Sequence, residues 1–255
     1  MPRPLVVAIY ATKILGIAIF VVTPYWPLAV LLFFGPDIFL FYQVFFPSAR
    51  LLCPVQVRFG TAAAEIWLTI DDGPDPADTP QILDLLDRHR ARATFFLIGE
   101  RAAKFPALVA EIVRRGHEVG CHTQTHPAAT FWCAGPRRVR AEIDEALRVL
   151  AAGGRPRVRW FRAPAGIKNL FLARVLAERR LRCIGWSVRS FDCAARSPAA
   201  AAARVLRQVR PGAIVLMHEG PSLRPAVRVA ALALVLQTLT ARGIACVLPA
   251  PERML

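Results

Sequence analysis

Short apolar runs alternate with helical stretches from residue 61 onward, and this alternation constrains the fold more than any other feature. The runs have the length and content of β-strands, and strand–helix–strand repeats are typical of parallel sheets. The predicted strands are 66–71, 94–98, 117–121, 157–162, 183–188, 213–217 and 244–248. The predicted helices are 79–88, 106–115, 136–152 and 225–241. We therefore expect an α/β fold of the distorted (β/α)7 barrel type.

Polar residues capable of chemistry stand at the carboxyl ends of five predicted strands. They are Asp71 and Asp72, His122 and His126, Arg162, Asp192, and His218. Barrel enzymes build their active sites at the carboxyl ends of the strands. The pattern therefore predicts one site on one rim.

The acidic pair and the two histidines indicate metal chemistry. One aspartate of Asp71-Asp72, together with His122 and His126, offers three ligands, and a catalytic zinc site has three protein ligands and an open position. The other aspartate is then free to act as a base. Asp-Asp-Gly-Pro alone is also typical of a turn, and a lone histidine at a strand end is typical of a core. The combination favours metal-assisted hydrolysis.

The first fifty residues are apolar enough to enter a membrane. The run 5–23 has nineteen residues and one charge, Lys13, and a second run extends from Pro27 to Phe46. As a helix, each would span about 28 Å, close to the ~30 Å hydrocarbon core. A cleavable signal peptide is the rival, but no small-residue cleavage site ends the first run. We expect a membrane anchor at 1–50, a linker at 51–63 and a catalytic domain at 64–255.

Basic residues at the ends of the two runs predict their orientation. Arg3 precedes the first run, Arg50 and Arg58 follow the second, and the turn between them has no charge. The positive-inside rule then gives a helical hairpin in the cell (plasma or inner) membrane with a cytoplasmic catalytic domain. Asp37, after Gly35-Pro36, interrupts the second run at a depth where charge is costly. A re-entrant second run, with the catalytic domain outside, is the alternative.

Net charge and cysteine usage narrow the possible partners. The formal net charge is +15, of which the first sixty residues carry only +3. Solvent-facing arginines are the simplest explanation, and an anionic membrane surface or a phosphorylated substrate is the alternative. No nucleic-acid-binding motif accompanies them, so we expect no nucleic acid. The six cysteines lack disulfide-framework or zinc-finger spacing, and most are interpreted as small buried packing residues.

Five ordered motifs between residues 64 and 250 resemble those of the NodB-type polysaccharide deacetylases, carbohydrate esterase family 4. Thr69-Ile-Asp71-Asp72-Gly73-Pro74 is similar to TFDDGP, His122-Thr-Gln-Thr-His126 to HxxxH, and Arg162-Ala-Pro164-Ala-Gly166 to RxPxG. Trp186-Ser-Val-Arg-Ser-Phe-Asp192 and Leu216-Met-His218 resemble the fourth and fifth motifs. The resemblance implies a NodB homology domain that removes an N-acetyl or other acyl group from an amino sugar.

The resemblance also implies a role for each site residue. Asp72, His122 and His126 would hold one divalent metal ion, usually zinc in this family. Asp71 would be the general base. A helical turn would let the two histidines, spaced i,i+4, face one ion.

The remaining implied roles concern proton delivery and charge. His218 would be the general acid, and Asp192 would orient and charge it. Arg162 would orient Asp71. The backbone N–H of Ala165 would help to stabilise the tetrahedral oxyanion.

Two departures from the family pattern bear on the substrate. Arg189 replaces the first aspartate of the fourth motif, and Cys193 replaces a tryptophan that lines the acceptor groove in relatives. A cation at the rim suggests a polyprenyl-phosphate-linked sugar rather than a glycan chain, and an ester could replace the amide. The alternative function is a non-catalytic membrane protein on the same fold that binds carbohydrate or anionic lipid.

Overall fold

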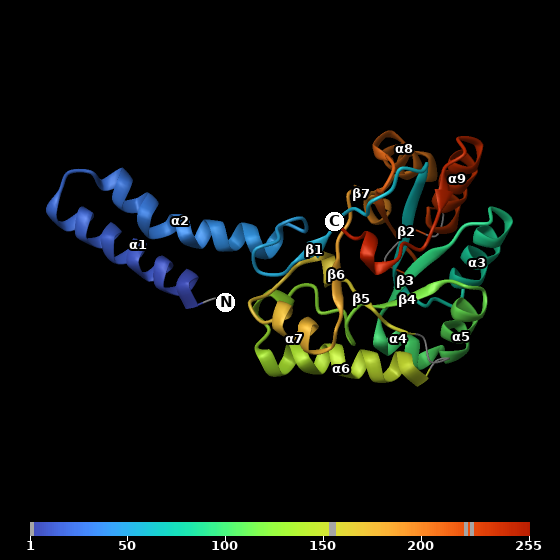
Figure 1. Cartoon of the computed structure of the whole chain (residues 1–255), viewed down its shortest axis with the longest axis horizontal. Coiled ribbons are helices and arrows are strands. Elements are labelled where there is room, and N and C mark those ends of the chain that lie inside the picture. Colours follow the sequence, from blue (N-terminus) through green and yellow to red (C-terminus); the bar gives the residue numbers. More distant parts are fainter. Residues whose placement is uncertain (1–2, 153–156, 222–223, 225–226) are drawn as a thin grey trace.

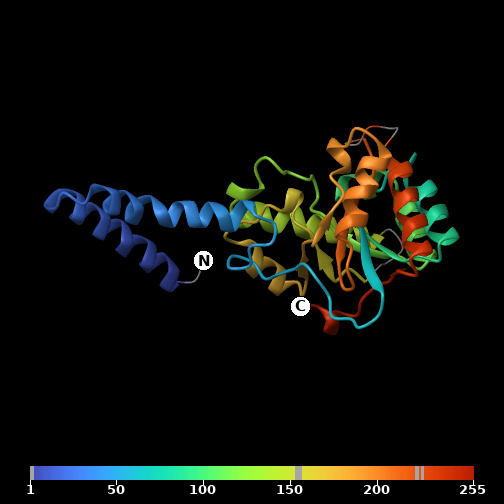
Figure 2. The ribbon, with the colours of Figure 1, turned by 90° about the horizontal axis from the view of Figure 1, so that it is seen from above.

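The computed structural model describes residues 3–152, 157–221, 224 and 227–255. A pair of long helices projects from one end of a rounded α/β domain (Figure 1). Seen from above, helices cover the outside of the curved sheet (Figure 2). The predicted start of the last helix at Pro225 lies outside the described residues.

Every strand pair in the sheet is parallel, as the strand–helix alternation predicts. The strand order is β1-β6-β5-β4-β3-β2-β8-β7, and β9 pairs with the first residues of β2. The strands are β1 (Val55–Gln56), β2 (Glu65–Gly73), β3 (Ala93–Leu97), β4 (Glu118–Cys121), β5 (Trp160–Phe161), β6 (Arg182–Ile184), β7 (Val188–Arg189), β8 (Ile214–His218) and β9 (Ala245–Cys246).

The sheet curls into a half-barrel because its two ends are joined by a very short piece of chain. β6 lies next to one edge strand and β7 is the other edge strand, yet only residues 185–187 separate them. Four Cα–Cα steps of 3.8 Å span about 15 Å at most. The single strand predicted at 183–188 is therefore two strands. β1 lies within the stretch 51–63 that the sequence suggests is a linker, so part of that stretch belongs to the sheet.

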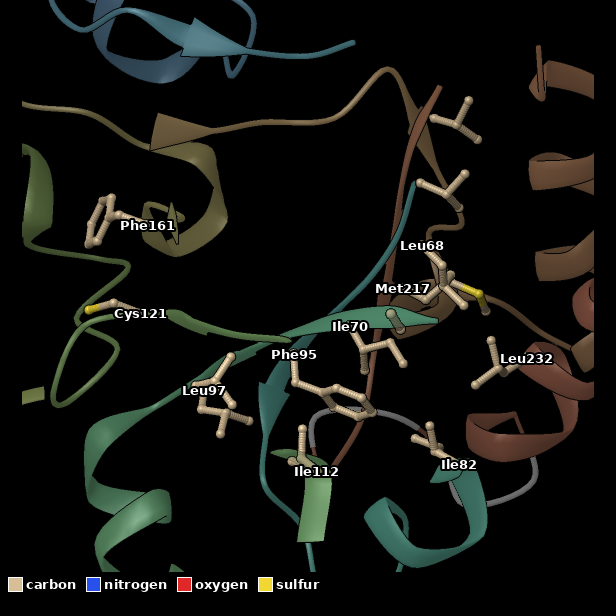
Figure 3. Packing of buried hydrophobic residues seen from close by; sticks show 14 of the residues in the cluster. Leu68, Ile70, Ile82, Phe95, Leu97, Ile112, Cys121, Phe161, Met217 and Leu232 are labelled. Carbon is tan, nitrogen blue, oxygen red and sulfur yellow. The ribbon is translucent and has the colours of Figure 1, made fainter. Parts of the chain in front are cut away.

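Alternation along β2 divides the core into two clusters. Ile66, Leu68 and Ile70 face the surrounding helices, and Trp67 faces the inside of the curl. Successive side chains of a strand point to opposite faces, so each cluster receives every second residue. In Figure 3, Leu68 and Ile70 lie with Phe95 and Met217 opposite helix residues such as Leu232. At the carboxyl ends of the strands, the inner face of the sheet ends in the polar rim.

The helices of the domain begin and end close to where sequence punctuation places them. α3 (Thr79–Arg88) and α6 (Pro136–Ala152) match the predicted bounds, each with proline in the first turn. The others are α4 (Gly99–Lys104), α5 (Pro106–Arg114), α7 (Leu172–Glu178), α8 (Pro198–Gln208) and α9 (Arg228–Ala241). Short 3-10 turns are η1 (Phe131–Cys133), η2 (Pro164–Gly166), η3 (Asp192–Ala194) and η4 (Pro251–Arg253).

The two N-terminal helices, α1 (Arg3–Val22) and α2 (Trp26–Phe45), form a hairpin whose turn lies far from the domain (Figure 1). Both are long and apolar enough to cross a membrane. α2 continues through Pro36, so the expected interruption at 35–37 does not occur. Asp37 instead pairs with Lys13 of α1 at 2.6 Å. In a membrane, this pairing would offset part of the cost of the Asp37 charge.

Candidate active site

The carboxyl end of β2 delivers two adjacent carboxylates to the same place. Trp67, Thr69 and Asp71 are successive inward-facing positions of β2. Asp71 lies in register with His218 of β8. Asp72 would point to the opposite face of a regular strand. Its backbone has a φ of 74°, in the left-handed region, and this bend returns its carboxylate to the inner rim. Both carboxylates therefore approach His122.

An irregular loop after β4 carries the two histidines, and it differs from the helical turn that their spacing suggests. Thr123 and His126 have φ values of 67° and 54°. The Thr123 hydroxyl accepts a hydrogen bond from the His126 N–H at 3.1 Å. The left-handed residues turn the chain back, so the two imidazole centroids lie 4.8 Å apart. Strained backbone of this kind clusters at functional sites.

Three donor atoms converge with the spacing of a tetrahedral metal site. The Nε2 atoms of His122 and His126 each lie 3.5 Å from Oδ1 of Asp72. Two bonds of 2.0–2.1 Å at a tetrahedral angle place their donors about 3.3–3.4 Å apart. His122 Nδ1 lies 2.8 Å from the Arg162 carbonyl oxygen, and donation to it leaves Nε2 as the free lone pair. The donor set fits a divalent metal ion.

Electrostatics favour the metal-binding forms of His126 and Asp72. Burial is the main cause that lowers the pKa of His126, to about 4, so its imidazole is neutral at pH 7. Burial raises the pKa of Asp72, but its hydrogen bond to His122 and the charge that the neighbouring imidazoles carry at low pH outweigh this effect. The net result is an Asp72 pKa well below its usual value.

Arg162 lies beneath the rim, and all three of its guanidinium nitrogens donate hydrogen bonds. Its Nη1 donates to Asp71 Oδ1 and to the Thr69 hydroxyl, each at 2.7 Å. Its Nε and Nη2 donate to the carbonyls of Ile184 and Gly185. The guanidinium is fully buried, and burial lowers its pKa against the opposing effect of Asp71. The hydrogen bond from Arg162 thus fixes Oδ1 of Asp71, and Oδ2 is directed toward His122.

His218 and Asp192 form a second polar pair across the rim. His218 Nδ1 lies 2.7 Å from Asp192 Oδ1, and the His218 N–H donates to Oδ2 at 2.8 Å. Burial lowers the pKa of His218, but its hydrogen bonds to Asp192 and Cys193 and the charge of Asp192 raise it well above 6.5. Burial raises the pKa of Asp192, and the bond to His218 reverses this shift. Both shifts favour an imidazolium paired with a carboxylate.

These residues surround one pocket of about 150 Å³. Ala165 lines it with a left-handed backbone, φ 52°, and Arg189 lines it from β7. The Arg189 guanidinium lies over the rings of Phe191 and Trp186, at 4.7 and 5.5 Å from their centroids. Every site residue expected from the sequence except Arg162 and Asp192, which lie behind Asp71 and His218, lines this pocket.

Sequence reasoning missed three supporting side chains. Glu142 of α6 accepts hydrogen bonds from the N–H groups of Gln124 and Thr125 at 3.0 and 2.9 Å, and from the Thr125 hydroxyl. Thr69 bonds Arg162, and Trp186 forms a wall of the pocket. A signal for Glu142 existed, because a carboxylate three residues after Val139 falls on the buried face of its helix.

A family model described as polysaccharide deacetylase matches residues 60–184. A chitooligosaccharide deacetylase of Sinorhizobium fredii is 42% identical over 164 residues, which are 64% of this chain and 75% of that protein. The peptidoglycan N-acetylglucosamine deacetylase Bc1960, solved with a hydroxamate, superposes with a TM-score of 0.71 and 31% identity, covering 77% of this chain and 91% of that one.

A catalytically silent relative has the same fold. BA3943, a carbohydrate esterase family 4 pseudoenzyme from Bacillus anthracis, superposes with a TM-score of 0.67 and 28% identity, over 75% of this chain and 66% of that one. The same fold therefore occurs in a deacetylase and in a pseudoenzyme, so the fold alone does not establish activity.

Proposed function

The chain belongs to the polysaccharide deacetylase family, and we propose that it is a membrane-anchored, metal-dependent hydrolase that removes the N-acetyl group of an amino sugar. The observation that carries the proposal is the convergence of Asp72, His122 and His126 beside Asp71 and opposite the charged His218. The named relatives act on chitooligosaccharide and on peptidoglycan N-acetylglucosamine, which makes an N-acetylated sugar the expected substrate.

Asp72, His122 and His126 would hold one divalent ion, and zinc suits two neutral imidazoles and a carboxylate. A bound ion supplies Lewis acidity to the scissile carbonyl and to water. Asp71 would take a proton from the attacking water. The bond from Arg162 to Oδ1 fixes the orientation of Asp71 and leaves Oδ2 beside the ligands.

His218 would give its proton to the amine nitrogen as the C–N bond breaks. Asp192 keeps the imidazole charged before that step and holds its ring in place. The N–H of Ala165, on a loop that lines the pocket, would donate to the oxyanion. Water and the amide thus become acetate and a free amino sugar.

Acetate release from N-acetylglucosamine oligomers and from a lipid-linked N-acetyl sugar tests the function. Asp71→Asn should retain the metal and lose turnover, whereas His122→Ala should lose both. Wild-type rates in Asp71→Asn would overturn the assignment of the base. If the protein binds one metal ion per chain but releases acetate from no sugar amide or ester, a non-catalytic binding protein would be favoured. The similarity to a pseudoenzyme is the reason to test for this outcome.

Arg189 supports a phosphate-bearing, lipid-linked sugar as the finer substrate. It lines the pocket where relatives have an acidic residue, and its guanidinium is held against two aromatic rings. Arg189→Ala should therefore weaken turnover of a polyprenyl-phosphate sugar more than that of a free N-acetylglucosamine oligomer. Equal losses on both would rule out a phosphate-binding role.

The hairpin supports a cytoplasmic catalytic domain, since its two ends lie on the domain side and carry the basic residues. Cys193 is exposed and reports the side of the membrane. A membrane-impermeant maleimide should label it in inside-out vesicles and not in intact cells. Labelling in intact cells would place the domain outside.

A further inference from the structure

A second hollow, of about 340 Å³, lies between α2 and the catalytic domain. One wall is the last part of α2, and the other consists of loops of the domain. Its lining is apolar apart from Asp37 at one end. We call this hollow the anchor groove. Its lining includes Leu40, Phe41 and Phe45 on α2, and Trp132, Leu170 and Phe171 on the domain.

The domain wall of the anchor groove is unusual for a surface in water. Trp132 is 48% exposed and Leu170 is 40% exposed, and Phe171 is exposed beside them. Grouped apolar side chains of this size mark a binding surface. They face the last part of α2, a helix long and apolar enough to cross a membrane, so in the membrane-anchored protein proposed above the wall would lie next to the lipid chains.

The anchor groove and the active-site pocket share two loops. One loop has His126 in the pocket and Trp132 in the groove, and the other has Ala165 in the pocket and Leu170 in the groove. Each loop covers the distance in five or six residues. The two hollows therefore lie no more than about 23 Å apart along either loop, a distance that a polar head with a long apolar chain can span.

The two hollows are also fixed relative to each other. Lys168 donates from its backbone N–H to the Val44 carbonyl at 3.0 Å and from Nζ to the Phe46 carbonyl at 2.5 Å, at the end of α2. Gly166 packs so closely that a Cβ there would lie 2.7 Å from both Pro47 and Trp186. The end of the anchor is thereby fastened to the wall of the catalytic pocket.

We propose that the anchor groove binds the hydrocarbon chain of the lipid that carries the N-acetylated sugar, while the sugar enters the pocket. The inference rests on the proposed function. A free glycan has no apolar part to fill such a groove, whereas a lipid chain reaches it directly from the bilayer around α2. Arg189 at the pocket supplies the charge complementary to a phosphate between sugar and lipid.

The first test compares two substrates with the same sugar head in the full-length protein, one with a long prenyl chain and one with a short water-soluble chain. Each methylene buried changes affinity roughly fourfold. The double variant Leu170→Gln, Phe171→Gln should raise KM for the long-chain substrate at least about tenfold and leave kcat/KM for the short one within about twofold. Leu234→Gln, an equally exposed leucine (38%) on α9, is the control and should change neither.

The second test reads chain binding without turnover. A lipid-linked N-acetylglucosamine with a brominated chain should quench Trp132 fluorescence saturably, with Trp132→Phe isolating its signal. Excess unbrominated long-chain lipid should reverse the quenching, and the short-chain compound should not.

The outcomes separate the groove from the chemistry. Equal losses on both substrates, or quenching that is not saturable, would overturn the groove proposal and leave the groove as a support for the loops or a seat for another protein. Saturable quenching with no acetate release would retain the groove and refute the proposed function.

Discussion

Two histidines on opposite sides of one pocket have opposite pKa shifts, and their neighbours explain the difference. His126 is half-buried beside His122, and its pKa falls to about 4. His218 is more deeply placed, but its bonds to Asp192 and Cys193 raise its pKa well above 6.5. These opposite shifts suit the roles proposed above, a neutral metal ligand on one side and a charged acid on the other. The environment, and not the residue type, assigns the role.

Removing the partner of His218 should have the largest effect on this contrast. Asp192→Asn removes the strongest of the groups that offset the burial of His218, so the pKa of its imidazole should fall and less of it should be protonated at neutral pH. General acid catalysis contributes between about 100-fold and 10,000-fold, and kcat should fall within that range. Metal content, measured on the purified protein, should stay at the wild-type level. Undiminished kcat would show that His218 is not the acid.

The pH profile sharpens the same contrast. The acid must carry its proton, so kcat should fall as pH rises through the raised pKa of His218. In Cys193→Ala, which removes a smaller contribution, this alkaline limb should move to lower pH by less than in Asp192→Asn. If the alkaline limb lies at the same pH in the wild type and in both variants, a group other than His218 is responsible for it.

The pH dependence of the free energy of unfolding should reflect the His218–Asp192 pair. The folded pKa of His218 lies above its unfolded value, so its contribution is present below pH 6.5 and is lost as pH rises through the folded pKa. The pKa of Asp192 is lowered, so its contribution is lost only as pH falls through that lower value. Chemical denaturation of Asp192→Asn should lack the alkaline loss that the wild type shows. The same loss in both would contradict the pairing.

Glu142→Gln should lower the affinity of the proposed ligands for the metal and leave His218 and Asp192 unaffected. Glu142 fastens the backbone between His122 and His126 through two N–H groups. Outer partners of metal ligands contribute 10- to 100-fold in affinity, and one retained amide oxygen makes about tenfold the expected loss. Metal titration measures this loss, and kcat at saturating metal should change less than about threefold. Unaltered metal affinity would show that the loop holds its shape without Glu142.

Elements with local signals were predictable from the sequence. Proline at a first turn and apolar spacing defined Thr79–Arg88 correctly, and the family motifs gathered the site residues on one rim. What depends on distant partners was not predictable. The split into β6 and β7 follows from the curl of the sheet, and Asp37 is accommodated through Lys13 of another helix. Glu142 supports a loop that is eighteen residues earlier in the chain.

Metal removal and return tests the central claim most directly. Acetate release by the full-length protein should be lost after chelation and restored when one equivalent of zinc per chain is added, while His122→Ala should not recover. Full turnover in the metal-free wild type would contradict the account.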